Sequence, residues 1–274
     1  NTFQGGTIEN VEGTGKYACY FAVPLNTVAQ ANEGNSVMYR TTATKLLTDG
    51  DGRVNGIEAV KYDGTKVTLH ANKGVILATG GFGANIDMVI STNDYWNKDE
   101  LSSAILTTNR NCATGEGITM AQDVGAVTTG MEFTQLMPLG WADDGKLAGG
   151  KGENVIFVSP AGTDNEGKRF VDESAERDVL SQGQLTYGGK GGLTVQVMNG
   201  GDNTAANNRE GKEYFCTLKE ACEMTGIDYD TLYQTIIEYD KAYLDQNLAE
   251  LEVPKSSATD TIGRYDEAGN YIED

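Results

Sequence analysis

Residues 37–71 constrain the fold of this chain most strongly, because β-branched runs alternate there with Asp–Gly pairs. The runs VMYRTTATKLL, RVNGIEAVKY and TKVTLHA are separated by DGDG and by the pair Asp63–Gly64. Asp–Gly between such runs is the strongest short-range signal for a β-hairpin. The pattern therefore predicts a β-meander. The run GVILATGGFG at residues 74–83 predicts one more strand, buried and ending in glycines, with a tight strand-to-helix turn as the alternative.

Helical spacing of apolar residues indicates further elements outside this segment. Residues 15–33 carry a partial apolar stripe, and a second helix is predicted at about residues 230–244. Thr217 and Glu220 have the spacing of a capping box in front of an apolar helical run. The polar residues 255–274 indicate no terminal element.

Composition and charge restrict the partners of the chain. Its 274 residues are 39% hydrophobic and 22% charged, the balance of a soluble globular protein. No apolar run approaches the roughly 20 residues that a membrane helix needs, so no transmembrane segment is predicted. The formal net charge of −19 repels phosphate backbones and anionic lipid. Nucleic acid and membrane surfaces are therefore excluded as expected partners.

Cysteine and histidine give no metal-site pattern. The chain has a single histidine, His70, and its four cysteines form no CxxC pair, so no metal site is predicted. His70 lies in a predicted strand and is expected to be a surface or sheet residue. The disulfide state of the cysteines is left open. These residues are Cys19, Cys112, Cys216 and Cys222.

The segment TTNRNCATGEGITMAQDVGA, residues 107–126, places Gly115, Glu116 and Gly117 in front of a predicted helix. Backbone N–H groups at a helix start suit an anion, but Glu116 is itself negative. An acidic side chain there suits a hydroxyl or ring N–H of a ligand better than a phosphate. A simple helix cap is the alternative.

Two more segments carry side chains of chemical interest, MEFTQLMPLG at residues 131–140 and EGKRFVDESAERDVLSQ at residues 166–182. The second of them mixes the cations Lys168, Arg169 and Arg177 with the carboxylates of Asp172, Glu173, Glu176 and Asp178. A solvated, salt-bridged surface helix is the ordinary explanation of such a run.

Taken in order, these segments resemble the flavoprotein subunit family of fumarate reductases and succinate dehydrogenases, and most closely its soluble flavocytochrome and urocanate reductase members. The family pattern reads VILATGGFG, then TN…ATGDGI, then Q..HP, then GKRFVNE…RD. Each part has a counterpart here, with family-like spacing. The resemblance extends over nearly the whole chain.

The resemblance implies an α/β plus α+β architecture that holds FAD. Residues 1–131 would form a partial Rossmann-like FAD-binding domain with a β-meander, and residues 132–274 an α+β substrate-capping domain. The glycine-rich dinucleotide fingerprint is absent, because the nearest match, EGTGKYA, lacks the acid that closes the following strand. The chain is therefore interpreted as an internal fragment that alone binds FAD weakly or not at all and is catalytically silent.

In that family, hydride passes from flavin to an activated C=C bond and a cap arginine delivers the proton. That arginine matches Arg177, and Glu173 or Glu153 would return its proton. Arginine has a pKa above about 12, so it donates only if it is reprotonated at once. On the cofactor side the resemblance assigns positions near FAD to Ala43, Thr79, Gly80, Gly81 and Glu116.

Two departures from the family pattern bear on the substrate. Met137 replaces the histidine of Q..HP, and Lys151 stands where an arginine of the TEAVRG segment is expected. With Glu153, these are the residues expected to contact the substrate. A methionine cannot donate a hydrogen bond to a carboxylate. The departures therefore favour an unsaturated acid other than fumarate.

Two other functions remain open: a ketosteroid-type dehydrogenase and a non-catalytic ligand-binding module on the same fold. Arg177 in its motif favours the reductase over both. The resemblance further implies an electron-donor domain or protein. It also implies an extracytoplasmic place in a bacterial cell envelope, with a cytoplasmic one left open.

Overall fold

The computed structural model describes residues 22–97, 99–148, 154–199 and 213–272. The chain divides into two compact units. The first contains residues up to 77 together with 123–126, and the second contains 78–122 and everything from 127 onward. Within the described ranges, no helix is long and apolar enough to cross a membrane.

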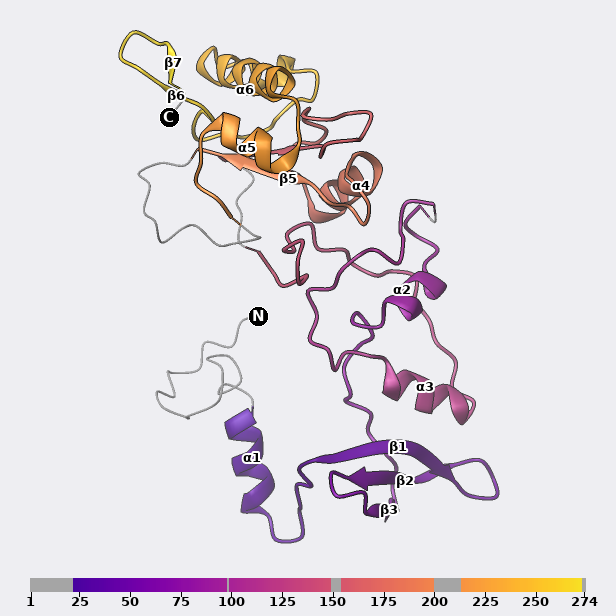
Figure 1. Ribbon diagram of the computed structural model, residues 1–274. Coiled ribbons are helices and arrows are strands. Elements are labelled where there is room, and N and C mark those ends of the chain that lie inside the picture. The colour runs from indigo at the N-terminus through magenta and orange to yellow at the C-terminus, as the bar shows by residue number, and fades with distance from the viewer. Residues whose placement is uncertain (1–21, 98, 149–153, 200–212, 273–274) are drawn as a thin grey trace. The chain divides into compact units, whose positions relative to one another are not determined.

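The first unit contains the predicted β-meander. Its elements are α1 (Ala22–Ala31), β1 (Thr41–Thr48), β2 (Val54–Lys61) and β3 (Lys66–His70). The strands pair antiparallel in the order β1-β2-β3 (Figure 1). The meander is thus confirmed, and so is the expected helix over the residues of α1. Its expected start, with the incomplete fingerprint, lies outside the described residues.

Aspartate and glycine shape the turns of the meander as the sequence indicates. The Asp49 carboxylate accepts the backbone N–H groups of Asp51 at 3.1 Å and Arg53 at 2.9 Å. At the second turn Gly64 adopts φ +84°, a left-handed conformation that favours glycine. His70 is exposed at the end of β3, as expected of a surface residue.

The second unit is built around the short strand β4. Its helices and strands are α2 (Ile86–Thr92), α3 (Glu116–Asp123), β4 (Val155–Val158), α4 (Arg177–Tyr187), β5 (Val195–Met198), α5 (Leu218–Thr225), α6 (Tyr229–Leu244), η4 (Leu248–Glu250), β6 (Arg264–Tyr265) and β7 (Tyr271–Ile272). β4 pairs antiparallel with β5, and Figure 1 shows α5 beside β5.

All four residues of β4 are buried, so this strand is covered on both faces. Ile156 and Val158 pack with α5, α6 and Ile262 in one core cluster. Val155 and Phe157 point to the opposite face, where they pack with α4 and the segment before it. β4 therefore joins the α5–α6 layer to the segment that leads into α4.

The predicted helices at the end of the chain are confirmed. Thr217 and Glu220 form a reciprocal capping box at the start of α5. Asp228 caps α6, and Gly226 between the two helices adopts φ +73°. The hairpin of β6 and β7 follows in a region where no element was predicted. It is held by Asp240, whose buried carboxylate accepts two backbone N–H groups and a tyrosine hydroxyl.

The strand predicted at residues 74–83 is not formed. Ile76 is 92% exposed, and among the described residues the backbone groups of residues 75–78 have no hydrogen-bond partner. A strand exists only where a neighbouring strand satisfies its N–H and C=O groups, and none is present in the described part. The alternative turn into a helix is present, since α2 begins at Ile86.

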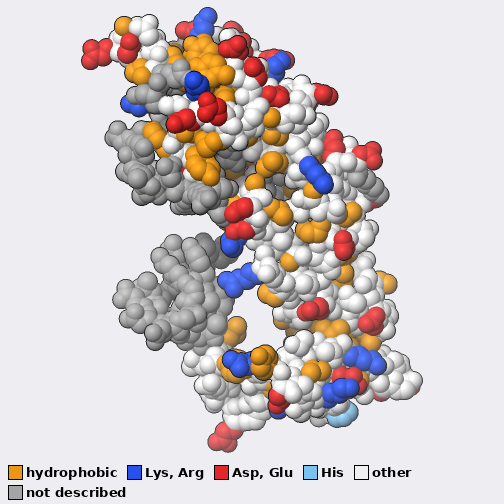
Figure 2. Space-filling view, viewed as in Figure 1, with side chains coloured by type: hydrophobic (Ala, Val, Ile, Leu, Met, Phe, Trp, Pro, Cys, Tyr) orange, Lys and Arg blue, Asp and Glu red, His pale blue; other side chains and the backbone are white. Residues whose placement is uncertain are grey.

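The described strands do not establish a Rossmann-like sheet, since the named sheets contain antiparallel pairs. Residues 78–122, expected with the cofactor domain, cluster with the second unit. The boundary between residues 131 and 132 stays a prediction. Acidic side chains occur singly and in small groups over the face in Figure 2.

Candidate functional site

The parts of the first two motif segments that belong to the second unit, residues 78–83 and 107–122, lie side by side. Gly115 N–H donates to the carbonyl of Gly81 at 3.1 Å. The Asn85 side chain donates to the carbonyl of Thr114 at 3.1 Å and also caps α2. These bonds bring Thr79, Gly80 and Gly81 close to the start of α3, where Glu116 is the first helical residue.

Gly117 allows this close approach. A Cβ atom at Gly117 would overlap the hydroxyl of Thr79 and lie 3.1 Å from its Cβ. Gly115 is similarly crowded, because a Cβ there would lie 2.7 Å from Met88 Sδ. The glycines on either side of Glu116 are buried while Glu116 itself is exposed. The spacing G-E-G thus lets the helix start pack against residues 79–81 and leaves the carboxylate outside.

Several polar groups of this cluster have no hydrogen-bond partner among the described residues. Among the described residues the N–H groups of Thr79, Gly80 and Gly81 have no hydrogen-bond partner. A Cβ at Gly80 or Gly81 would meet nothing within 4 Å, and Gly80 adopts φ +81°. The hydroxyl of Thr114 is buried without a partner. Open space beside unsatisfied donors fits a polar ligand that lies against the backbone.

The third and fourth motif segments also meet within the second unit. Gln184 of α4 donates to the carbonyl of Pro138 at 3.0 Å, and Leu139 packs on the cluster that includes Leu180. Trp96 donates to the carbonyl of Thr134 at 2.7 Å. The half-buried Met137 is therefore in a segment held against α4.

Arg177 is the first residue of α4 and its side chain is exposed. Among the described residues it makes no hydrogen bond or ion pair. A cation at the N-terminus of a helix is disfavoured by the helix dipole. Helix stability therefore gives no reason for an arginine here, whereas an anionic ligand would.

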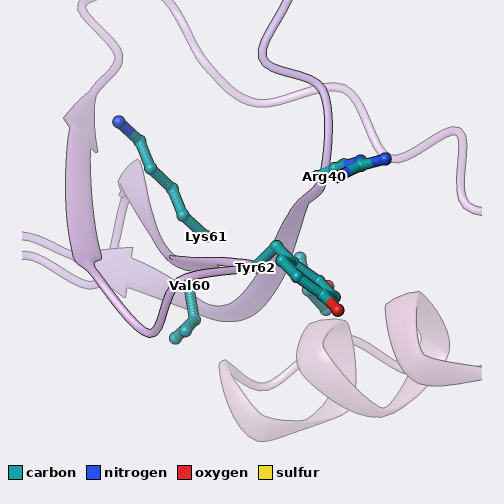
Figure 3. A pocket seen from close by; sticks show the side chains of 5 residues that line it. Arg40, Val60, Lys61 and Tyr62 are labelled. Carbon is teal, nitrogen blue, oxygen red and sulfur yellow. The ribbon is translucent and has the colours of Figure 1, made fainter.

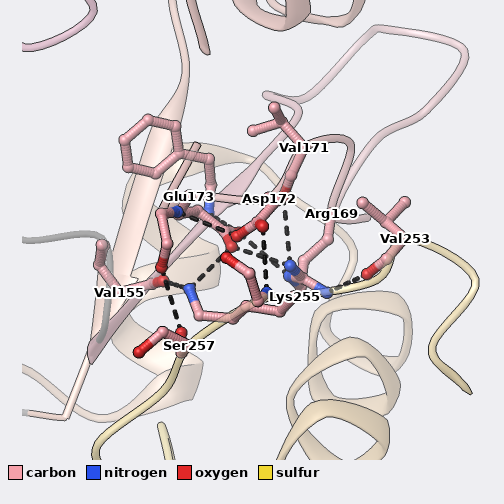
Figure 4. A network of polar contacts seen from close by, with 11 residues as sticks. Val155, Arg169, Val171, Asp172, Glu173, Val253, Lys255 and Ser257 are labelled. Atoms are coloured by element: carbon pink, nitrogen blue, oxygen red, sulfur yellow. Dashed lines mark hydrogen bonds and ion pairs between the residues drawn. The ribbon is translucent and has the colours of Figure 1, made fainter. Parts of the chain in front are cut away.

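Glu173 belongs to a buried cluster (Figure 4), and its hydrogen bonds and ion pairs within the described residues go to partners other than Arg177. Its carboxylate accepts the backbone N–H of Phe157 at 2.9 Å, Arg169 Nε at 3.0 Å and Nη2 at 2.8 Å, and Lys255 Nζ at 2.9 Å. These donors occupy both oxygens. The expected return of a proton from Glu173 to Arg177 therefore has no geometric support. The solvated-face explanation is wrong for Arg169 and Glu173, whose side chains are 6% and 0% exposed.

Lys255 completes this cluster and has no local signal in the sequence, because it lies 82 residues from Glu173. Burial lowers the pKa of the Lys255 ammonium, and the Glu173 carboxylate opposes that shift. The Tyr239 ring centre lies 5.4 Å from Arg169 Cζ and 5.7 Å from Lys255 Nζ. Burial, with Glu173 nearby, raises the pKa of the Tyr239 phenol.

Of three further predicted site residues, one lies in the first unit and two lie outside the described residues. Ala43 lies in β1 of the first unit, opposite Ala59 and next to a bulge. Lys151 and Glu153 lie outside the described residues. An open hollow on the first unit contains none of the predicted site residues (Figure 3). It is lined by Arg40, Thr42, Val60, Lys61 and Tyr62.

Sequence comparison gives a family and relatives for the chain. The sequence profile of the FAD binding domain matches residues 20–265. NADH:acrylate oxidoreductase of Vibrio harveyi is 40% identical over 221 residues, 76% of this chain and 21% of that protein. Urocanate reductase of Eggerthella lenta is 30% identical over 230 residues, 77% of this chain and 36% of that protein. The chain thus spans well under half the length of these relatives.

Structural comparison agrees on the fold. The open conformation of a flavocytochrome c3 fumarate reductase matches 91% of this chain and 43% of its own, with a TM-score of 0.68 and 20% identity. A 3-ketosteroid delta1-dehydrogenase from Sterolibacterium denitrificans matches 85% of this chain with a TM-score of 0.58 and 19% identity. Both likenesses concern the fold alone.

The packing of Gly117 against Thr79 predicts an effect that depends on the background. Gly117→Ala should lower the free energy of unfolding by about 1–3 kcal/mol, because the new methyl group meets the Thr79 hydroxyl. In a Thr79→Ala background the same change should cost less, because the hydroxyl that the new methyl group overlaps is gone, although the Cβ of residue 79 stays 3.1 Å away. Urea denaturation of the four proteins measures this cycle. An equal cost of Gly117→Ala in both backgrounds would contradict the packing.

Proposed function

We propose that this chain, which belongs to the FAD binding domain family, is the part of an FAD-dependent oxidoreductase that reduces an activated C=C bond of a small unsaturated acid. One observation carries the proposal: Arg177 is exposed and unpaired among the described residues, at the start of the helix whose Gln184 holds the segment that contains Met137. Relatives named as acrylate and urocanate reductases support the reaction class.

The residues of the first motif cluster fit FAD. The unsatisfied N–H groups of Thr79, Gly80 and Gly81 and the buried hydroxyl of Thr114 could form hydrogen bonds with a polar ligand that lies against the backbone. Glu116 would accept a hydrogen bond from a hydroxyl or ring N–H. When bound, FAD supplies the hydride for the reduction. Ala43 is proposed as a further contact, and weak binding of FAD by this chain alone stays a prediction.

Arg177 is proposed as the proton donor. Its guanidinium would donate to the carbon next to the one that receives hydride, and its charge would stabilise the developing carbanion. Donation at a pKa above about 12 requires prompt reprotonation. Because Glu173 is engaged in the buried cluster, Glu153 remains the proposed source of that proton.

Met137 is proposed to select monocarboxylic over dicarboxylic substrates. A thioether offers no hydrogen-bond donor, so a second carboxylate at that end would lose its solvation without a replacement bond. Lys151 is proposed to hold the carboxylate that the substrate does have. A monocarboxylic acid with a conjugated C=C bond satisfies both conditions. The relative that is 40% identical is named for acrylate, which is such an acid.

An electron-donor domain or protein is proposed to reduce the flavin between turnovers. The name of the same relative points to NADH as the ultimate source of electrons there. An extracytoplasmic location is also proposed, since the fold is shared with a flavocytochrome fumarate reductase.

The substrate proposal predicts the effect of Met137→His. In the whole flavin-loaded protein, reoxidation of the reduced flavin should be faster with acrylate than with fumarate. The imidazole of the variant can donate to a second carboxylate, so kcat/KM for fumarate should rise by about 10-fold. Stopped-flow absorbance measures both reactions. Met131→His, in the same segment, is the matched control and should change neither. A variant that leaves the preference unchanged would contradict this role of Met137.

The proton-donor proposal predicts that Arg177→Gln affects only one of the two half-reactions, the reoxidation of the reduced flavin by the unsaturated acid. Reduction of the flavin should proceed as in the wild type, because Arg177 has no part in it. Reoxidation by the unsaturated acid should slow by about 100-fold or more, the usual contribution of a general acid. Lys241→Gln, at an exposed lysine of α6, should leave both rates intact. Wild-type reoxidation in Arg177→Gln would assign the proton to another group.

A further inference from the structure

The segment that leads into α4 is fastened to residues 253–257, which come some eighty positions later in the chain. The Asp172 carboxylate accepts the backbone N–H of Ser256 at 3.0 Å. The Ser174 hydroxyl donates to the carbonyl of Ser257 at 3.2 Å. Both bonds lie within five residues of Arg177, so they act directly on the backbone that begins the helix.

Lys255 fixes the same segment from the inside. Its ammonium donates to Glu173 at 2.9 Å and to the carbonyl of Val155 in β4 at 3.0 Å (Figure 4). Arg169 adds a bond to the carbonyl of Val253 at 2.7 Å. The side chains of Lys255 and Glu173 are both 0% exposed. Residues 253–257, called the strap below, thus link β4 to the residues that precede Arg177.

The Arg177 side chain has no comparable support. Among the described residues nothing holds its guanidinium, so its direction depends on the backbone of the first turn of α4. The cap residue Glu176 makes no side-chain hydrogen bond at that helix start. The position of the turn therefore depends on the packing of α4 through Leu180 and Gln184, and on the contacts of residues 172–174 with the strap and with β4.

We infer that Lys255, through the strap and Glu173, is a positioning residue for Arg177. The inference rests on the proposed function, in which Arg177 must meet a reacting carbon. Lys255 is buried and touches neither substrate nor cofactor in this role. A displacement of about 1 Å at a reacting group can cost about 100-fold in rate. A small shift of the first turn of α4 is therefore sufficient to slow turnover.

The test is Lys255→Met in the whole flavin-loaded protein, with Lys219→Met on the exposed side of α5 as the matched control. Hydrogen exchange of the amides of residues 174–180 reports the order of the first turn. Steady-state kinetics with acrylate give kcat and KM separately. We expect faster exchange in that turn, a fall in kcat of about 10- to 100-fold and an unchanged KM and flavin content.

Each outcome decides the inference. Wild-type exchange and kcat in Lys255→Met would overturn it, and so would faster exchange with an unchanged kcat. If the wild type reduces no unsaturated acid, the proposed function fails, while wild-type exchange would still overturn the clamp separately. If Lys255→Met does not fold, Ser174→Ala removes one strap bond without leaving a buried charge unpaired. Ser174→Ala should show a smaller increase in exchange and a smaller fall in kcat than those expected for Lys255→Met. Wild-type exchange and kcat in Ser174→Ala would overturn the inference.

Discussion

The hydrogen bonds of the Glu173 carboxylate hold together the segments that form the second unit. It joins β4 through Phe157 N–H, the preceding segment through Arg169, and a distant segment through Lys255. Removing one partner of such a buried set typically costs about 3–5 kcal/mol, because the remaining charges stay buried without compensation. The cluster therefore links parts of the chain that are distant in sequence.

Much of the fold was predictable because its signals are local. Asp–Gly turns predicted the meander, and Thr217 with Glu220 predicted the start of α5. The strand predicted at residues 74–83 is absent, because strand formation depends on a neighbouring strand that the local sequence does not reveal. The β6–β7 hairpin was missed for a related reason: the buried Asp240 that holds it lies on α6, more than twenty residues earlier.

The candidate site was predictable in its parts and not in its connections. The resemblance assigned Thr79 and Glu116 to the cofactor and Met137 and Arg177 to the substrate, and the structure brings residues 79–81 to the start of α3 and residues 138–139 to α4. The resemblance implied a proton-return role for Glu173 or Glu153, whereas the structure places Glu173 in a buried cluster with Arg169 and Lys255. Lys255 carried no signal at all, since its partner is distant in sequence. The dehydrogenase alternative has only a fold likeness in its favour.

The most direct test of the account is a crystal structure of the whole flavin-loaded protein with a small unsaturated monocarboxylic acid bound. The account predicts the Arg177 guanidinium within about 3.5 Å of the carbon that accepts the proton. It also predicts Met137 beside the end of the acid that bears no carboxylate. Arg177 turned away from the acid, with another proton donor at that carbon, would contradict the assignment of the site.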